Sequence, residues 1–163
     1  MKHLVVASFA GLCLLLGLPA ASYGNHDGPR PINTLPRYGG KAKSKALQKI
    51  DQDFIASELR KYRRDAHAAS EVSVELGWQH LAQQDPAVSI KRFNQAWLLD
   101  STNCNVYYGF SACLSLQGDA KAAREYFRLA QRRDPKNQGA AKYNERLAEL
   151  RNKQADVSAN ILT

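Results

Sequence analysis

The cysteines are the most reactive side chains in this sequence, and their spacing limits the chemistry open to them. Cys13 lies in an apolar N-terminal stretch, whereas Cys104 and Cys113 lie nine positions apart on one predicted helix. A helix rises about 1.5 Å per residue, which places these two Cα atoms roughly 13 Å apart, and a disulfide requires about 7 Å or less. We therefore expect two small, partly buried thiols. The alternative is an intermolecular bridge, which an oxidising compartment would permit.

The remaining polar residues show no pattern for catalysis or metal binding. His26, His67 and His80 have no metal-ligand spacing with one another or with an acidic residue. The sequence holds no Ser–His–Asp arrangement, no glycine-rich phosphate loop and no Walker motif. We therefore predict that the protein is not an enzyme and has no catalytic residue, no metal and no cofactor.

The positive charge has one ordered part. The formal net charge is +8, and Arg124, Arg128 and Arg132 recur every four residues after Lys121. This spacing puts four cations, the basic stripe, on one face of a helix, and such a row is typical of a solvated face. The alternative is a surface for an anionic partner: an acidic protein, lipid headgroups or a cell-envelope polymer. Nucleic acid is not expected, because no recognised nucleic-acid-binding module accompanies the charge.

These residues must be positioned by the stretch from Ser70 to Asn137, which reads as two copies of one 34-residue pattern. Shifting the second copy back by 34 positions aligns similar residues: Asp85 with Asp119, Ser89 with Ala123, Phe93 with Phe127, Ala96 with Ala130, Asp100 with Asp134, and Asn103 with Asn137. Self-similarity at this period is typical of helical repeat arrays, in which each unit buries its apolar face against the next.

Each copy divides into two helices with recognisable ends. In the second copy we expect a helix from Cys104 to Gln117, ended by Gly118, because glycine takes the left-handed conformation without strain. Asp119 then caps a second helix that stops at Asp134-Pro135. In the first copy Asp85 is the corresponding cap, and Pro86 occupies the first helical position.

The pattern resembles the tetratricopeptide repeat (TPR) family. The first copy carries the family's residues at Leu76-Gly77, Ser89, Phe93 and Ala96, and the second at Tyr107, Gly118, Ala123, Phe127, Ala130 and Pro135. The resemblance implies an all-α fold, a short TPR-type solenoid with two repeats and a capping helix at each end. The repeats would span about 70–103 and 104–137 within a domain of residues 65–153.

The resemblance also implies a binding surface. In the family the first helix of each repeat lines an inner, concave groove that binds peptides, and the basic stripe would lie on the outer, convex side. The corresponding groove residues are Val74, Trp78, Leu81, Asn105, Tyr108, Ala112, Ser115, Lys142 and Arg146. The family's clamp for chaperone C-terminal carboxylates is not expected, because Val74, Trp78 and Gly109 stand where that clamp requires Lys and Asn.

The N-terminus reads as a signal peptide over residues 1–22. A short basic start precedes the apolar run from Leu4 to Leu18, which is shorter than the roughly 20 residues that a membrane span needs. Small residues predict cleavage after Ser22, with Gly24 as the alternative site, and a retained anchor is the alternative to cleavage. We therefore predict a periplasmic or secreted protein without a stable membrane span after cleavage.

The segments on either side of the repeats are expected to form an arm, two capping helices and a frayed tail. Residues 23–43 are rich in glycine and proline and predict an extended linker or arm, although the patch at 35–40 could instead pack onto the repeats. An amphipathic helix over 44–64 is expected to cover the N-terminal end of the stack, and a helix over 138–153 to cap the other end. Residues 154–163 are expected to fray.

The predicted function is non-catalytic protein–protein interaction in the cell envelope. An adaptor or assembly factor of this kind would bind a peptide segment of a protein partner in the concave groove. The alternative is a binder of an anionic envelope surface or polymer through the basic stripe.

Overall fold

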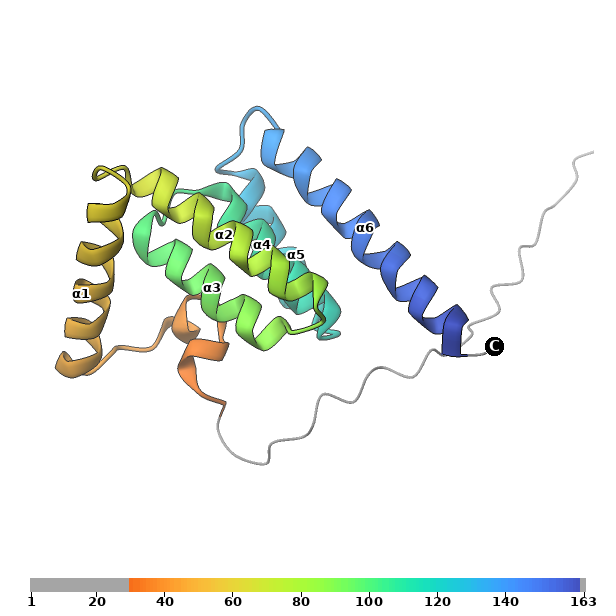
Figure 1. Ribbon diagram of the computed structural model, residues 1–163, viewed down its shortest axis with the longest axis horizontal. Coiled ribbons are helices and arrows are strands. Elements are labelled where there is room, and N and C mark those ends of the chain that lie inside the picture. Colours follow the sequence, from red (N-terminus) through yellow and green to blue (C-terminus); the bar gives the residue numbers. More distant parts are fainter. Residues whose placement is uncertain (1–29, 162–163) are drawn as a thin grey trace, which may run out of the picture.

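The computed structural model describes residues 30–161, with side chains as far as Lys153. In this part of the chain all regular structure is helical, which confirms the all-α prediction. Two short 3-10 helices precede six α-helices (Figure 1). Their bounds are η1 Ile32–Thr34, η2 Pro36–Gly40, α1 Lys45–Lys61, α2 Ala66–Ala82, α3 Pro86–Leu99, α4 Cys104–Leu116, α5 Ala120–Gln131 and α6 Gln138–Ile161.

The helix starts follow from local capping chemistry. The side chain of Asp85 accepts a hydrogen bond from the Val88 amide at 3.0 Å, and that of Asp119 accepts one from the Ala122 amide at 3.0 Å. Each bond satisfies a backbone donor that has no partner inside the helix. Gly118 has a φ of +82°, the left-handed conformation expected after α4. The predicted caps at Asp85, Asp119 and Gly118 are confirmed, whereas α5 ends at Gln131, before the expected stop at Asp134-Pro135.

The core forms where α2, α3 and α4 meet around one aromatic ring. Phe93 on α3 is fully buried, and Gly77 of α2 and Gly109 of α4 lie against it. A Cβ atom would approach the Phe93 ring to 2.6 Å at Gly77 and to 2.2 Å at Gly109. Both glycines are therefore required by close helix approach. Further packing joins α4 to α5 and α4 to α6.

The N-terminal arm differs from the extended linker expected for 23–43. Residues 31–40 turn twice and pack against α3, below it in Figure 1. The fully buried Asn94 holds them: its amide nitrogen donates to the carbonyls of Asn33 and Leu35 at 3.0 and 2.9 Å, and its oxygen accepts from the Arg37 amide at 2.7 Å. Residues 23–29 lie outside the described residues.

Helix α1 is attached more loosely than a capping helix would be. It contacts α2 and α3, but none of its side chains is buried. Leu47 and Ile50 are 41% and 62% exposed, and Figure 1 shows α1 standing across the end of the α2–α3 pair. The expectation that its apolar face would cover the stack is wrong for this part of the helix.

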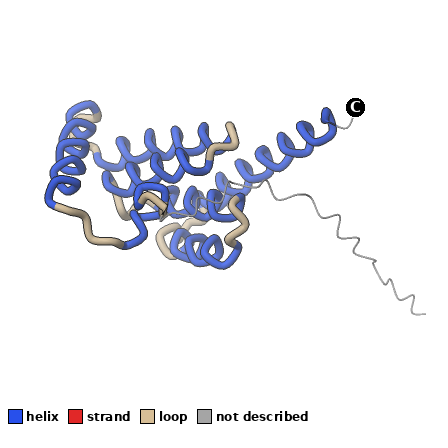
Figure 2. The backbone as a smooth tube through the Cα atoms, turned by 90° about the horizontal axis from the view of Figure 1, so that it is seen from below, coloured by secondary structure: helices blue, strands red, loops and turns tan. Residues whose placement is uncertain are grey.

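Helix α6 is longer than expected. It continues to Ile161, so the predicted frayed tail at 154–163 is helical as far as the structure describes it. Figure 2 shows its C-terminal part projecting beyond the other helices. The predicted signal peptide lies outside the described residues. Between residues 30 and 161, no helix combines the length and the hydropathy that crossing a bilayer requires.

Candidate functional site

Most residues of the predicted concave groove lie in the core. Five of them, on α2 and α4, are 7% exposed or less: Val74, Trp78, Leu81, Tyr108 and Ala112. Their apolar side chains pack into one cluster with Phe93 and Tyr143. The expectation that these five side chains line an open groove is corrected, because a partner could reach at most the edge of Trp78.

Helix α6 closes the part of the predicted groove that surrounds Val74, Trp78 and Tyr108. Residues Val74, Trp78, Asn105, Tyr108, Lys142 and Arg146 do come together as predicted, but around a cavity of only about 10 Å³. A cavity of about 10–15 Å³ is needed to hold a single water molecule. The predicted groove is therefore filled by the chain itself, since α6 supplies Gly139 and Tyr143 to the same cavity wall.

Two residues of α6 bring it this close. A Cβ atom at Gly139 would lie 2.8 Å from Asn105 Oδ1 and 2.9 Å from Tyr108 Cε2, so only glycine permits the approach to α4. Tyr143 is 8% exposed, and its ring centroid lies 5.3 Å from that of Tyr108 and 5.4 Å from that of Phe127. The aromatic contacts of Tyr143 anchor α6 on the α4–α5 pair.

Asp134 links the same two helices. Its carboxylate accepts from the backbone amides of Gln138 and Ala140 at 3.0 and 2.9 Å and from the Tyr108 hydroxyl at 3.2 Å. It therefore caps the start of α6 and fixes it to α4. Burial raises the pKa of Tyr108, and the neighbouring charge of Asp134 raises it further. Tyr108 is thus a neutral hydrogen-bond donor with a structural role.

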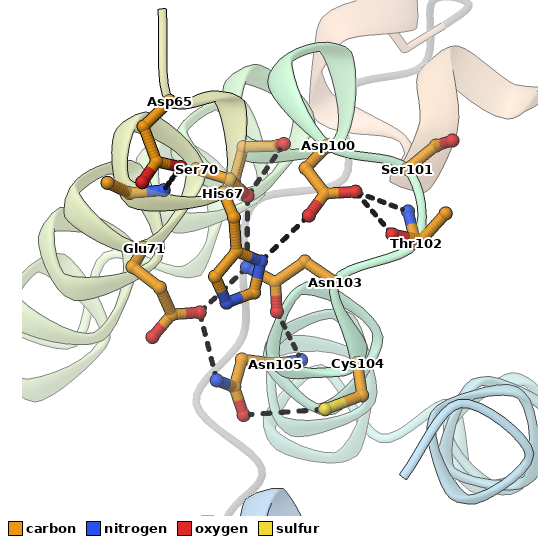
Figure 3. A network of polar contacts seen from close by, with 12 residues as sticks. Asp65, His67, Ser70, Glu71, Asp100, Ser101, Thr102, Asn103, Cys104 and Asn105 are labelled. Carbon is orange, nitrogen blue, oxygen red and sulfur yellow. Dashed lines mark hydrogen bonds and ion pairs between the residues drawn. The ribbon is translucent and has the colours of Figure 1, made fainter. Parts of the chain in front are cut away.

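The side chain of the predicted groove residue Asn105 is also occupied by hydrogen bonds within the protein. Figure 3 shows it in a polar network between α2 and the turn that follows α3. The amide nitrogens of Asn103 and Asn105 donate to Glu71 Oε1 at 2.7 and 2.9 Å. On the same side His67 Nδ1 lies 2.8 Å from Asp100 Oδ2. Partial burial acts to raise the pKa of Asp100, but hydrogen bonds from Thr102 and His67 outweigh it and hold that pKa below its usual value.

An open groove does exist, displaced to the line between α2 and α6. This α2–α6 groove has a volume of about 450 Å³. Its base includes Trp78, Ala82 and Leu150, and its walls carry three acidic and three basic side chains: Glu75, Glu145, Glu149, Lys142, Arg146 and Lys153. Three predicted groove residues, Trp78, Lys142 and Arg146, therefore line a usable surface.

Arg146 organises this groove. Its guanidinium lies 5.1 Å from the centroid of the Trp78 ring, and its Nη2 donates to Glu75 Oε2. Its Nη1 is buried without a hydrogen-bond partner among the described atoms. Further along, Lys153 Nζ donates to the Ala82 carbonyl at 2.9 Å. Arg146 and Lys153 thus tie α6 to α2 across the groove while leaving space between them.

The basic stripe is exposed as expected. Lys121, Arg124 and Arg128 on α5 and the C-cap residue Arg132 are all exposed, and their side chains form no ion pair or hydrogen bond within the described part of the chain. The next cation differs: the Arg133 guanidinium lies 4.2 Å from the centroid of the Tyr107 ring and donates to the Leu129 carbonyl. Arg133 is structural, whereas the stripe is free for a partner.

Two members of the stripe border a second groove instead of an open convex face. This α5–α6 groove has a volume of about 370 Å³, and Tyr143 is the α6 residue that lines it, whereas Lys142 and Arg146 line the α2–α6 groove. Arg124 and Arg128 stand on its α5 side, and Phe127, Ser115 and Tyr143 also line it. Lys121 and Arg132 do not line it. No sequence pattern indicates this groove, because it exists only where α6 leaves part of α5 uncovered.

The thiols have no reactive setting. Cys104 is half-buried and Cys113 is fully buried, and both are free. Burial raises the pKa of both thiols, and the charges of Asp134 and Glu71 add to the effect at Cys104. Burial also excludes Cys113 from an intermolecular bridge. Among the side chains that the structure describes, residues 30–153, no three of His, Cys, Asp or Glu lie close enough together to hold a metal ion.

Comparison of the chain with protein-family models, with curated proteins and with solved structures finds no match. The resemblance to the TPR family therefore rests on the 34-residue pattern of the sequence alone.

Proposed function

We propose that this protein is a non-catalytic protein–protein interaction module that binds a peptide segment of its partner in the α2–α6 groove. The single observation that carries the proposal is the groove itself, about 450 Å³ in volume with the edge of Trp78 at its base. Grooves of roughly 300–1,000 Å³ lined by aromatic and polar groups are typical binding sites. Trp and Arg are also the residues most often found at the energetic centres of interfaces.

The walls of the groove define the kind of peptide that would fit. Along α6 the groove residues alternate in charge, with Glu145 and Glu149 between Lys142, Arg146 and Lys153, and Glu75 adds an acid from α2, so the groove presents both charges. A segment carrying both acidic and basic side chains around one apolar residue would complement it. The helices that form the walls are held by Tyr143 and Asp134, and such a preformed groove lowers the ordering cost of binding a flexible segment.

The proposed setting is the cell envelope. The apolar run at 4–18 followed by small residues supports export, with cleavage after Ser22 and a periplasmic or secreted mature protein. The 34-residue pattern supports assignment to the TPR family, whose members serve widely as adaptors and assembly factors. We propose that role here.

Photo-crosslinking in cells tests the groove. A photoreactive amino acid replaces Gln79, which is exposed and lines the α2–α6 groove, while the matched control replaces Asn144, which is exposed on α6 outside both grooves. We expect a discrete protein adduct from position 79 that is absent from position 144. Equal adducts from both positions, or none from position 79 while other surfaces crosslink, would contradict the proposal.

A second candidate function is binding of an anionic envelope surface through the basic stripe. Its support is the set of four exposed cations without partners in the described chain. Exposed charges are screened over about 8 Å at physiological ionic strength. Binding through the stripe should therefore collapse between low and physiological salt, whereas binding at Trp78 should persist.

A further inference from the structure

We propose that the α5–α6 groove is a second binding site, and that it takes an extended acidic peptide in which two carboxylate side chains flank one apolar side chain. The carboxylates would pair with Arg124 and Arg128 on α5, and the apolar side chain would point away from α5 and pack against Tyr143 on α6. This site goes beyond the proposed α2–α6 groove and does not depend on it.

The charge of the groove selects an anionic occupant. Its lining contains two arginines and no carboxylate, and neither guanidinium has an ion-pair partner within the described residues. Like charges four positions apart on a helix repel each other. A bound carboxylate pair would replace this repulsion with two charge-assisted hydrogen bonds, which are among the stronger polar contacts.

The rest of the lining favours a peptide over a bare anion. Phe127 is half-buried and leaves part of its ring open to the groove. Tyr143 lies beside it, and Ser111 holds the α4 side by donating its hydroxyl to the Ala123 carbonyl at 2.9 Å. This surface has an aromatic base next to its cations, so it offers contacts that a phosphate ion or a carboxylate alone would not use.

The dimensions of the groove match an extended segment. A volume of about 370 Å³ has room for a few side chains, whereas a helix with its side chains is about 10 Å across. Arg124 and Arg128 are separated by one helical turn, roughly 6 Å along the axis. Alternate residues of a strand lie roughly 6.6 Å apart on one side, and the residue between them points the other way. An acidic–apolar–acidic tripeptide therefore places its carboxylates toward α5 and its apolar side chain toward Tyr143.

The neighbouring cations separate this site from a general electrostatic surface. Lys121 and Arg132 belong to the same stripe and are equally exposed, but they do not line the groove. A lipid surface or an anionic polymer would engage all four cations. A peptide in the groove would engage only Arg124 and Arg128.

Fluorescence anisotropy with the purified protein at physiological salt tests the proposal. The probe is a labelled peptide with a central Glu-Phe-Glu between Gly-Ser flanks, and the comparison probes carry Gln-Phe-Gln and Glu-Gly-Glu. The double variant Arg124→Gln/Arg128→Gln is compared with the control Lys121→Gln/Arg132→Gln, which removes the same charge from the same helix. Thermal melting confirms that both variants fold.

We expect the Arg124→Gln/Arg128→Gln variant to lose at least tenfold in affinity for the Glu-Phe-Glu peptide, and the control to stay within about twofold. Both comparison peptides should bind at least fivefold more weakly than Glu-Phe-Glu. Equal losses in the two double variants would overturn the site in favour of a diffuse charged surface. Equal binding of Glu-Phe-Glu and Gln-Phe-Gln would overturn the ionic pairing. Binding of anionic phosphatidylglycerol vesicles but not of the peptide would assign the stripe to a membrane surface instead.

Discussion

The two sides of helix α6 differ in how their charges are satisfied. Toward α2, Arg146 pairs with Glu75, and three acidic and three basic side chains line the groove. Toward α5, Arg124 and Arg128 face no acid within the groove. Both grooves border the same helix and contain an aromatic residue. Their difference lies in whether the chain itself supplies the counter-charge.

This difference has consequences for recognition. Where the chain supplies both charges, a partner must match a pattern of charges and displace or join existing contacts. The shape of the partner and the spacing of its charges therefore determine whether it binds. Where only cations are present, any anion is attracted and the neighbouring apolar surface must provide selectivity. We therefore expect weak salt dependence for binding on the α2 side and strong salt dependence on the α5 side.

Removing the aromatic anchor of α6 should destroy both grooves and with them the difference between the two sides. Tyr143 packs against Tyr108, Phe127 and Trp78. We expect Tyr143→Ala to reduce the free energy of unfolding by about 3 kcal/mol, as for other large aromatic truncations in cores, and to abolish binding in both grooves. Chemical denaturation measures the change. Tyr143→Phe is the control, because it keeps the ring; an equal loss in both variants would mean that the ring is not the anchor.

Overpacking the buried face of α5 should weaken binding mainly in the α5–α6 groove. Ala130 is fully buried on α5. We expect Ala130→Leu to cost about 1–3 kcal/mol of stability and to weaken binding in the α5–α6 groove more than in the α2–α6 groove. The control for stability is Ala120→Leu, at an exposed position of the same helix, which should cost less than about 0.5 kcal/mol. It is not a control for binding, because Ala120 lines the α5–α6 groove. Unchanged melting of Ala130→Leu would mean that the helix register is wrong.

The ion pair across the α2 side should give a small but measurable coupling. A double-mutant cycle of Arg146→Met and Glu75→Gln compares the pair with its single variants. We expect a coupling of about 0.5–1 kcal/mol at low salt, because Glu75 is half exposed and the pair is partly screened. A coupling of zero at low salt would show that Glu75 does not neutralise the charge of Arg146 in the α2–α6 groove.

Charge reversal on the α5 side should have the smallest effect on stability. Arg128 is exposed and has no ion-pair partner among the described residues. We expect Arg128→Glu to change the free energy of unfolding by less than about 0.5 kcal/mol, as measured by thermal melting. A large loss would place Arg128 in an interface that buries it.

The N-terminal arm shows where sequence reasoning was incomplete. Residues 31–40 contain few apolar side chains and two adjacent glycines, so their composition indicates a linker. The structure packs them on α3 through the buried amide of Asn94, which bonds to three backbone groups. The available signal was Asn94 itself, a polar residue at a buried position of α3. Its hydrogen-bond partners are 57–61 positions away in the sequence and could not be identified from spacing.

The sequence by itself determined the helices, their caps and the exposure of the basic stripe. Asp85, Asp119 and Gly118 act on backbone groups within a few residues, so local chemistry was sufficient. Only the tertiary structure decided that Val74 and Tyr108 are core residues and that the surface is divided into two grooves. The physical reason is the placement of α6, which depends on Gly139 meeting Tyr108 and on Tyr143 meeting Phe127. These contacts join side chains on separate helices, and helical periodicity carries no information about them.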